Sequence, residues 1–473
     1  MTREGLLIGG EWRDGVSPFT VTDKFTGEPL AEVAAASREH VNQAVRAAAE
    51  AFGRAPLPPY ARYEILHRAA ALVEGRRDSF AATIVAESGF TTADAGGEID
   101  RCVQTLLACA EEAKRIAGEM VPIDGAPGQE NRLAFTLRQP LGVVCAITPF
   151  NSPLNTVAHK IGPAIAAGNT VVLKPATQTP LTAALLCRAL VDAGLPPGRL
   201  NLLQGRGADV GQWLLEEPDI AFYTFTGSTA VGRTIQRTIG LRRSQLELGS
   251  ISSTIVCDDA DLARAIPRCV NASFRKAGQV CTSVQRLYVQ RSILQGFVAA
   301  LVDATARVRV GDPRDAATLV GPMISGNEAA RAAAWVDEAV AQGARLACGG
   351  RRDGALFQPT ILVDVGARMR VMCEEIFAPV ISIVPYAALD DAIGEINATP
   401  YGLAAGIFTS NVNTAMNAAR RLEVGTVHVN ETSSSRVDVM PYGGVKESGF
   451  GREGPKYAIH EMTAERLVTW SLY

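Results

Sequence analysis

The sequence has 473 residues, of which 47% are hydrophobic and 20% are charged, and its net charge is −3. This length and composition indicate a globular protein of two or three domains. The chain has no basic block, no apolar run near the roughly 20 residues of a membrane span, and no signal-peptide pattern at its start. We therefore expect a cytoplasmic protein that binds neither nucleic acid nor membrane.

The nine cysteines are scattered along the chain and form no C-x-x-C pair. A zinc site or a disulfide framework needs closely spaced or regularly paired cysteines, so neither is predicted, and no metal is expected. Reduced thiols in a cytoplasm fit this pattern best.

The first part of the chain changes its pattern at Ser37. Residues 5–35 hold short strand-like runs, whereas apolar residues after Ser37 recur at helical spacing and predict several helices, one of them over about 97–118. Residues 120–140 are rich in proline, glycine and charge. This segment is interpreted as a projecting hairpin arm.

From Pro140 onwards, apolar strands alternate with helices of ten to fifteen residues. This alternation predicts βαβ units, a parallel sheet covered on both faces, and hence a doubly wound nucleotide-binding architecture. Thr179, Pro180 and Gly194 mark the start and the end of one of the helices. The predicted strands cover residues 142–148, 170–174, 200–203 and 221–226.

The alternation begins again after Gly249 and predicts a second α/β domain. The last segment contains the strand-like run 466–470, which is expected to pair with the arm or with a neighbouring subunit. Within the second domain, strands are predicted over 254–257 and 286–289, and helices over 261–276 and 294–310.

Cys281 follows a predicted helix and Gly278, and it precedes a strand. A loop between two regular elements exposes a side chain while the scaffold holds it, which suits a nucleophile. A free cysteine is more often a small buried hydrophobic residue, so this position alone does not establish a function.

Two positions in the first predicted sheet suit a nucleotide. Gly227 and Ser228 lie where a strand runs into a helix, and a helix N-terminus binds a pyrophosphate well. Lys174 ends another strand, at the edge where such sheets bind ligands. A capped glycine turn and a solvated lysine are the alternative explanations.

Two further residues suit acyl chemistry. Glu247 has apolar neighbours, which raise a carboxyl pKa and favour a general base. The amide of Asn151 follows the first strand of the sheet and suits a developing oxyanion. An ion-paired glutamate and an ordinary turn asparagine are the alternatives.

Seven motifs in order along the whole chain resemble the aldehyde dehydrogenases of the large NAD(P)-dependent superfamily. The spacings agree as well, with 23 residues from Asn151 to Lys174 and 34 from Glu247 to Cys281. The motifs are Pro149-Phe-Asn151, Leu173-Lys-Pro-Ala176, Phe225-Thr-Gly-Ser-Thr229, Leu246-Glu-Leu-Gly249, Gly278-Gln-Val-Cys281, Glu374-Glu-Ile-Phe-Ala-Pro379 and Pro441-Tyr-Gly-Gly-Val-Lys446.

The resemblance implies an α/β fold with a Rossmann-type cofactor domain (1–118 and 141–248), a catalytic domain (249–440) and a small β oligomerisation arm (119–140 and 455–473). It also implies a homodimer or homotetramer, with the arm at the interface.

The resemblance further implies that Cys281 attacks the aldehyde, that Asn151 holds the oxyanion and that Glu247 activates the water that hydrolyses the thioester. Lys174 is placed with the catalytic residues and with the cofactor. The implied cofactor contacts are Ile147, Thr148, Pro149, Phe150, Lys174, Thr177, Gly207, Phe225, Gly227, Ser228, Val231, Leu248, Glu375 and Phe377.

Three departures from the commonest family pattern stand out. Thr177 replaces a glutamate that binds the ribose 2′-hydroxyl in many NAD-specific members, so NADP is favoured over NAD. Ser250 replaces a glycine, but Glu247 is kept, so hydrolysis is expected rather than transfer to coenzyme A. Ala378 also replaces a glycine, with little expected effect.

The segments that carry Arg101, Ser152 and Arg436 line the aldehyde tunnel in this family and resemble the lactaldehyde and phosphonoacetaldehyde dehydrogenases. Two arginines suit a phosphonate, phosphate, sulfonate or carboxylate tail. Structural ion pairs are the alternative, and Val280 and Ser152 stand where phosphonoacetaldehyde enzymes carry arginine and histidine.

The predicted function is therefore oxidation of a small aldehyde, anionic or hydroxylated, to its acid. A coenzyme A-acylating enzyme and a non-catalytic protein with the same fold are the alternatives.

Overall fold

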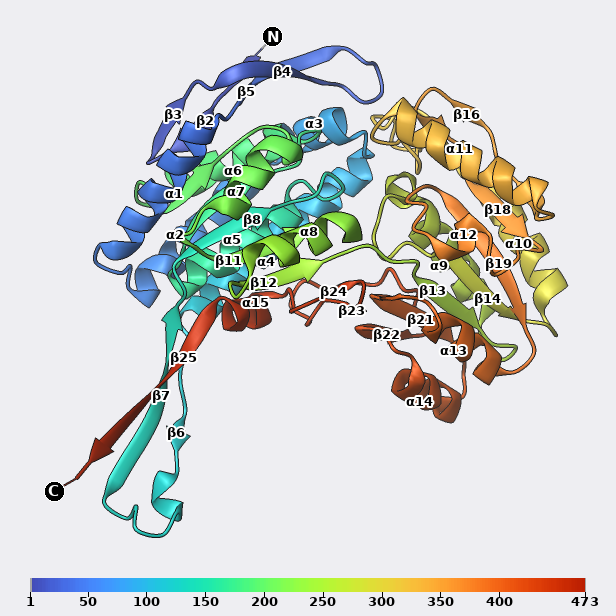
Figure 1. Ribbon diagram of the computed structural model, residues 1–473. Coiled ribbons are helices and arrows are strands. Elements are labelled where there is room, and N and C mark those ends of the chain that lie inside the picture. The colour runs from blue at the N-terminus through green and yellow to red at the C-terminus, as the bar shows by residue number, and fades with distance from the viewer. Residues whose placement is uncertain (1, 473) are drawn as a thin grey trace.

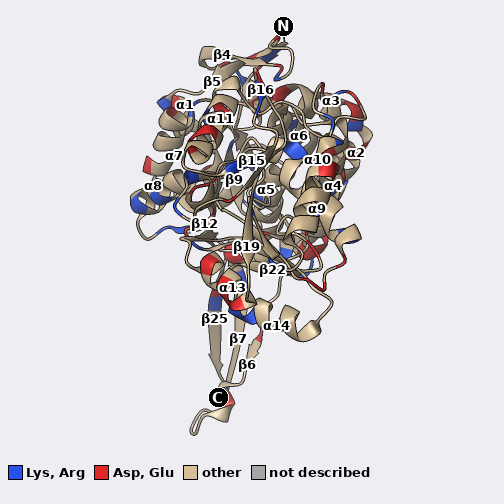
Figure 2. Ribbon diagram, turned by 90° about the vertical axis from the view of Figure 1, so that its right-hand side faces the viewer, with Lys and Arg blue, Asp and Glu red and all other residues tan. Residues whose placement is uncertain are grey.

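A computed structural model describes residues 2–472 and shows two α/β lobes and a narrow projecting sheet (Figure 1). Basic and acidic residues are both spread over the two lobes (Figure 2). Among residues 2–472, no helix combines the length and the hydropathy that a bilayer span requires.

The first lobe is built on an eight-stranded sheet with the order β24-β12-β11-β8-β9-β10-β2-β3. Its five strands from β12 to β10 are parallel, as the alternation of strands and helices predicted. The strands are β2 (Leu6–Ile8), β3 (Glu11–Arg13), β8 (Val143–Ile147), β9 (Thr170–Lys174), β10 (Leu200–Leu202), β11 (Ile220–Thr226), β12 (Arg243–Glu247) and β24 (Gly449–Phe450).

The chain order reverses between β8 and β11, because β9 and β10 continue on one side of β8 while β11 lies on the other. At such a switch point the loops after the strands separate and leave room for a ligand at the carboxyl edge of the sheet. The loops that begin at Thr148 and Gly227 leave the sheet there.

Helices cover both faces of this sheet, and consecutive residues of β8 point to opposite faces. Val144 and Ala146 belong to one core cluster with α4 and α5, whereas Val143 and Cys145 belong to the other with α1. The helices of this lobe are α1 (Arg38–Gly53), α2 (Pro59–Gly75), α3 (Arg77–Ser88), α4 (Thr92–Ala113), α5 (Asn155–Ala167), α6 (Pro180–Asp192), α7 (Gln212–Glu216) and α8 (Thr229–Ile239).

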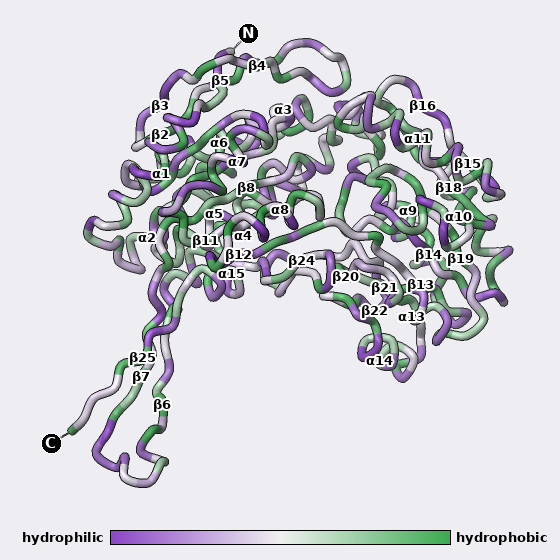
Figure 3. The backbone as a smooth tube through the Cα atoms, viewed as in Figure 1, coloured by the Kyte–Doolittle hydropathy of each residue, from purple (hydrophilic) through white to green (hydrophobic). Residues whose placement is uncertain are grey.

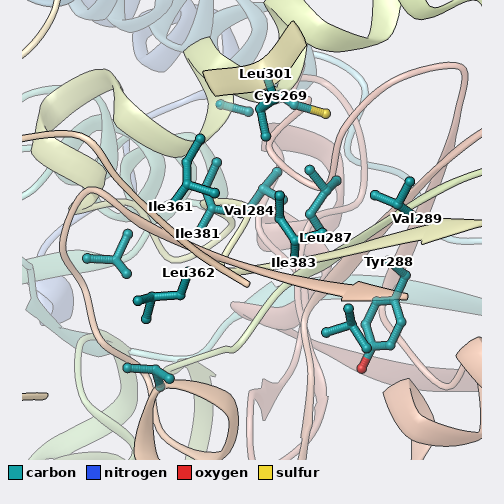
Figure 4. Close-up of a cluster of buried hydrophobic side chains, with 14 of the residues drawn as sticks. Cys269, Val284, Leu287, Tyr288, Val289, Leu301, Ile361, Leu362, Ile381 and Ile383 are labelled. Atoms are coloured by element: carbon teal, nitrogen blue, oxygen red, sulfur yellow. The ribbon is translucent and has the colours of Figure 1, made fainter. Parts of the chain in front are cut away.

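The second lobe has a seven-stranded sheet with the order β15-β18-β19-β14-β13-β21-β22, parallel except for the edge strand β15. Apolar residues of β14, β18 and β19 belong to one core cluster with Cys269 of α9 (Leu262–Phe274) and Leu301 of α10 (Leu294–Ala306) (Figure 4). The strands are β13 (Ser253–Val256), β14 (Arg286–Gln290), β15 (Arg345–Cys348), β18 (Thr360–Val363), β19 (Val380–Tyr386), β21 (Ala404–Phe408) and β22 (Thr426–Val429).

Six helices belong to this second lobe, and a short 3-10 helix, η3 (Arg275–Gly278), follows the first of them. The helices are α9 (Leu262–Phe274), α10 (Leu294–Ala306), α11 (Gly326–Ala341), α12 (Arg370–Cys373), α13 (Leu389–Asn397) and α14 (Val412–Arg421). Three small sheets complete the body: β1 (Thr2–Glu4) with β4 (Val16–Thr22) and β5 (Pro29–Ala35), β16 (Arg352–Asp353) with β17 (Leu356–Phe357), and β20 (Tyr401–Gly402) with β23 (Val445–Lys446).

The projecting sheet contains β6 (Met120–Val121), β7 (Arg132–Pro140) and β25 (Thr463–Ser471). β25 pairs antiparallel with β7 along its whole length, so the C-terminal strand joins the arm of its own chain. Polar and apolar residues are mixed along this sheet (Figure 3). The preceding helix α15 (Pro455–Glu461) packs on the first lobe instead, because Ile459 belongs to the core beside α5.

Candidate active site

A cavity of about 550 Å³ opens at the carboxyl edge of the first sheet and reaches the second lobe. Most of the residues that the sequence suggested for a site line it. They are Arg101, Thr148, Pro149, Phe150, Asn151, Ser152, Phe225, Gly227, Ser228, Val231, Glu247, Leu248, Cys281, Glu375, Phe377 and Arg436.

Cys281 lies in a loop whose backbone is unusually constrained. Lys276 and Ala277 both have a φ of 53° and Gly278 has a φ of 70°, in the left-handed region that only glycine adopts freely. A Cβ at Gly278 would lie 2.1 Å from the carbonyl oxygen of Ala378, so glycine is required there. The tight turn ends the helical segment and sets Cys281 at the cavity wall.

Burial raises the pKa of the Cys281 thiol to about 11, although a contact with Tyr442 and the charge of Arg436 act in the opposite direction. Its Sγ lies 3.0 Å from the hydroxyl of Tyr442. The thiol is therefore mostly protonated at neutral pH in the protein without ligands.

A buried ion pair joins the Asn151 loop to the Cys281 loop. The Lys276 ammonium donates to Glu98 (2.7 Å) and to the backbone oxygen of Asn151 (3.0 Å). The Asn151 side-chain amide in turn donates to the backbone oxygen of Gln279 at 2.8 Å. This arrangement leaves the second amide hydrogen of Asn151 free to point at a substrate oxygen near Cys281.

Glu247 ends β12 and is buried, and neither of its carboxyl oxygens has a hydrogen-bond partner in residues 2–472. Burial raises its pKa well above the usual range, and the negative charge of Glu453 raises it further. A buried carboxyl group without partners, at the wall of a cavity, is suited to accept a proton from water.

Glu453 is the charged neighbour that stays ionised. Burial alone would raise its pKa, but Lys160 (3.1 Å) and Arg436 (2.6 Å) outweigh burial and hold the pKa below its usual range. The pKa values of Glu247 and Glu453 are therefore shifted in opposite directions, because only Glu453 is paired with cations.

The other end of the cavity has the features of a nucleotide site. Ser228 caps α8 by accepting from the backbone N–H of Val231 at 3.4 Å, so the helix N-terminus faces the cavity. Glu375 accepts from the backbone N–H of Ser250 at 2.9 Å, and burial raises its pKa to about 7. A Cβ at Gly249 would approach Glu375 to 2.8 Å, so this glycine leaves room for the carboxylate.

Four of the predicted cofactor residues do not line this cavity, namely Ile147, Lys174, Thr177 and Gly207. Lys174 is buried and donates to the backbone oxygen of Pro175, and burial lowers its pKa to about 8. Thr177 donates to the backbone oxygen of Gly205 at 3.1 Å. Gly207 begins a π-helix, η2 (Gly207–Gly211), with open space around it.

Arg101 and Arg436, proposed from the sequence as anion ligands, both line the cavity and both take part in ion pairs. Arg101 makes a two-pronged contact with Asp438, at 3.1 and 2.7 Å. Arg436 is paired with Glu453 and stacks on the ring of Tyr442, with 3.8 Å from its guanidinium carbon to the ring centre. Ser152 donates its hydroxyl to Glu98 at 3.0 Å.

Sequence reasoning did not assign a third arginine at this site, Arg275. It lines both this cavity and an adjoining one of about 510 Å³, together with Arg101 and Arg436. Its hydrogen bond goes to the hydroxyl of Ser434 at 2.9 Å, and within residues 2–472 no carboxylate lies within ion-pair distance of it. Burial lowers its pKa, as expected for a cation without a counter-ion.

Tyr442, Lys276 and Glu453 are further cavity residues that sequence reasoning left without a role. Tyr442 stands in the Pro441-Tyr-Gly-Gly motif and Arg275 stands six residues before Cys281, so both positions could have been considered. Nothing in the local sequence signals Glu98 as the partner of Lys276 or Lys160 as a partner of Glu453, since these pairs are separated by 178 and 293 residues.

A doubly wound sheet, a helix N-terminus at its switch point, and a cysteine and a carboxyl group in one cavity together define a cofactor-dependent enzyme. The model of the aldehyde dehydrogenase family matches residues 12–468. The chain therefore belongs to the aldehyde dehydrogenase family, and it is an NAD(P)-dependent oxidoreductase that acts on aldehydes.

Individual relatives of the chain are also named as dehydrogenases of aldehydes. The chain is 50% identical over 468 residues to a 3-sulfolactaldehyde dehydrogenase from Priestia aryabhattai, covering 99% of this chain and 98% of that protein. It is also similar to the NADP-complexed NADP-dependent glyceraldehyde-3-phosphate dehydrogenase from Bacillus halodurans C-125, with 37% identity, a TM-score of 0.97 and full coverage of both chains. An aldehyde dehydrogenase from Physcomitrella patens in complex with the reaction product succinate has 36% identity and a TM-score of 0.97, covering 99% of this chain and 98% of that one.

Proposed function

We propose that Cys281 is the nucleophile of this aldehyde dehydrogenase and that Glu247 is its general base. The Cys281 thiolate adds to the aldehyde carbon, and the carbonyl oxygen becomes an oxyanion. The second amide hydrogen of Asn151 and the backbone N–H of Cys281 hold this oxyanion. When this carbon gives up its hydride to a bound hydride acceptor, a thioester would remain on Cys281. Glu247 then takes a proton from the water that attacks the thioester, which releases the acid and the thiolate.

The residues at the far end of the cavity fit a nicotinamide dinucleotide, which supplies the hydride acceptor when it is bound. The N-terminus of α8, capped by Ser228, suits the pyrophosphate. The carboxylate of Glu375 suits a ribose hydroxyl pair, because it is held by the backbone of Ser250 and has one oxygen left. Phe150 and Phe377, which line the same cavity, form an edge contact with ring centres 5.9 Å apart.

We infer that the substrate is a short aldehyde with an anionic group, of which 3-sulfolactaldehyde is the leading candidate. The single observation that carries this inference is Arg275, a cavity guanidinium that has no carboxylate partner within residues 2–472. Arg101 and Arg436 are already neutralised by Asp438 and Glu453. A sulfonate, phosphate or carboxylate tail supplies the missing counter-ion for Arg275 and accepts its N–H groups.

Replacement of Arg275 by glutamine is expected to lower kcat/KM much more for anionic than for neutral aldehydes. A charge-assisted hydrogen bond is worth roughly 1.5–3 kcal/mol, so kcat/KM for 3-sulfolactaldehyde should fall about 100-fold. For lactaldehyde, which has the same skeleton without the sulfonate, the change should be about threefold or less. Steady-state NAD(P)H formation at 340 nm measures both values.

Two control variants accompany this experiment. Arg275→Lys keeps the charge and should recover part of the activity on the sulfonate. Arg307→Gln, at the exposed residue directly after α10, should change the activity on neither substrate. An equal loss for both aldehydes in Arg275→Gln would contradict the anionic substrate. Formation of the free acid in the absence of coenzyme A would exclude a coenzyme A-acylating enzyme.

We also propose that the enzyme prefers NADP over NAD. Thr177 stands on the loop after β9 and leaves no carboxylate there to repel a 2′-phosphate. Lys174 ends that strand, and although burial lowers its pKa, a bound phosphate would favour the charged ammonium.

Replacement of Thr177 by glutamate is expected to reverse this preference. The added carboxylate repels a 2′-phosphate and offers an acceptor to a 2′-hydroxyl, so kcat/KM with NADP should fall about 100-fold while the value with NAD changes little. Thr177→Val is the matched control, because it removes the hydroxyl without adding charge. A preference of the unmodified enzyme for NAD would contradict the proposal.

We propose a homodimer or homotetramer in which the projecting sheet forms part of the interface. The sheet exposes Met120, Leu137, Leu467 and Trp470, which are apolar side chains that a second copy could cover. We also propose the cytoplasm as its compartment, because all nine cysteines are free thiols.

A further inference from the structure

Tyr442 is held firmly in the wall of the cavity, and the proposed roles of Cys281, Asn151 and Glu247 do not involve it. Its backbone N–H donates to the backbone oxygen of Glu453 at 3.1 Å, and its backbone oxygen accepts from the backbone N–H of Glu453 at 2.6 Å. The side chain is 4% exposed. One face of its ring is covered by the guanidinium of Arg436, 3.8 Å from the ring centre.

The Tyr442 hydroxyl has one neighbour with which it can form a hydrogen bond. Among the hydrogen bonds of residues 2–472, its only partner is the Cys281 Sγ, at 3.0 Å. Because backbone pairing and the stacked arginine hold the ring, the hydroxyl cannot swing away to another acceptor. A phenol is the stronger donor of the two groups, and a thiolate is the stronger acceptor.

The charged groups that face this pair come from several elements and differ in sign. Arg436 and Arg275 are cations near the sulfur, whereas Glu247 and Glu375 are acids that disfavour a second negative charge there. Burial outweighs these charges and raises the pKa of the Tyr442 hydroxyl well above its usual range, so this group keeps its proton. It is therefore available as a donor at neutral pH.

We propose that Tyr442 is a further catalytic residue, whose hydroxyl donates to the Cys281 thiolate and stabilises the ionised nucleophile. The proposal rests on Cys281 being the nucleophile, and it holds whichever aldehyde is the substrate. No proton is transferred: the hydrogen bond forms as the thiol ionises and weakens when the sulfur becomes a neutral thioether. The same bond stabilises the thiolate as it leaves the thioester during hydrolysis.

The test is the ionisation of Cys281 in the Tyr442→Phe variant, measured on the protein without substrate. Thiolate absorbance at 240 nm is followed against pH, and the Cys281→Ala protein is subtracted to remove the other eight thiols. Loss of one hydrogen bond to the thiolate should raise the thiol pKa by about one unit, so the thiolate fraction at pH 8 falls about tenfold.

The rate of alkylation by iodoacetamide gives a second readout. A thiolate of higher pKa is intrinsically more nucleophilic, so the rate at pH 8 should fall only about threefold while the thiolate fraction falls tenfold. A hole in the packing would expose the sulfur and speed up alkylation instead. Tyr60→Phe, an exposed tyrosine on α2, is the control and should leave both readouts unchanged.

Incorporation of 3-fluorotyrosine at position 442 covers the case in which Tyr442→Phe does not fold. Fluorine makes the phenol a stronger donor, so the pKa of Cys281 should fall rather than rise. An unchanged or lower pKa in Tyr442→Phe, or an unchanged or higher pKa in the fluorotyrosine protein, would overturn the proposal. An active Cys281→Ala enzyme would instead refute the role of Cys281 itself.

Discussion

The Cys281→Ala enzyme is expected to form no detectable NAD(P)H with any aldehyde. Without the sulfur no thiohemiacetal forms, and an uncatalysed hydride transfer from an aldehyde hydrate has no route at a useful rate. Loss of a nucleophile typically costs a factor of about 10⁴ to 10⁶ in kcat, which takes the activity below the limit of a 340 nm assay.

Two further variants show whether this loss comes from the nucleophile itself. Cys281→Ser retains nearly the same shape but an alcohol ionises far less readily than a thiol, so it should also be inactive. Cys373→Ala removes an exposed thiol of the second lobe and should retain full activity. The melting temperature of all three should stay within a few degrees of the unmodified protein. Substantial NAD(P)H formation by Cys281→Ala would contradict the proposed mechanism.

The Glu247→Gln enzyme should behave differently, because it lacks the base but keeps the nucleophile. Rapid mixing with aldehyde should give a burst of about one NAD(P)H per active site, followed by a steady rate lower by about 10²- to 10⁴-fold. The burst reports formation of the thioester, and the slow phase reports its hydrolysis. Glutamine has the same shape as glutamate but cannot accept a proton from water.

The pH dependence gives an independent check on Glu247. Its pKa is raised, chiefly by burial, so the base is protonated at low pH and becomes active as the pH rises through its pKa. The kcat of the unmodified enzyme should therefore increase with pH, and this increase should be absent from the slow phase of Glu247→Gln. Glu465→Gln, on the projecting sheet, is the control. Absence of a burst, or an unchanged steady rate, would exclude Glu247 as the base for hydrolysis.

Local pattern in the sequence was sufficient to predict most of the regular elements. β9 spans the predicted residues 170–174, because a short apolar run specifies such an element directly. The start of α6 at Pro180 after Thr179 was also confirmed. The predicted helix over about 97–118 instead runs over Thr92–Ala113, since Thr91 caps it by accepting from the backbone N–H of Asp94.

The family resemblance in turn depended on short motifs that fold locally. Turn glycines and the residues beside them keep their spacing because each motif has to make one loop or one helix start. This was enough to name Cys281, Glu247 and Asn151 together and to predict that they meet at one site. All three line the same cavity.

The ionic partners of the site were decided only by the tertiary structure. Lys276 pairs with Glu98, 178 residues away, and Cys281 lies against Tyr442, 161 residues away. The sequence also could not show that Asp438 and Glu453 neutralise Arg101 and Arg436. Nor could it show that Arg275 has no carboxylate at ion-pair distance within residues 2–472. Charge pairing depends on which loops meet across the two lobes, and no local periodicity specifies such a meeting.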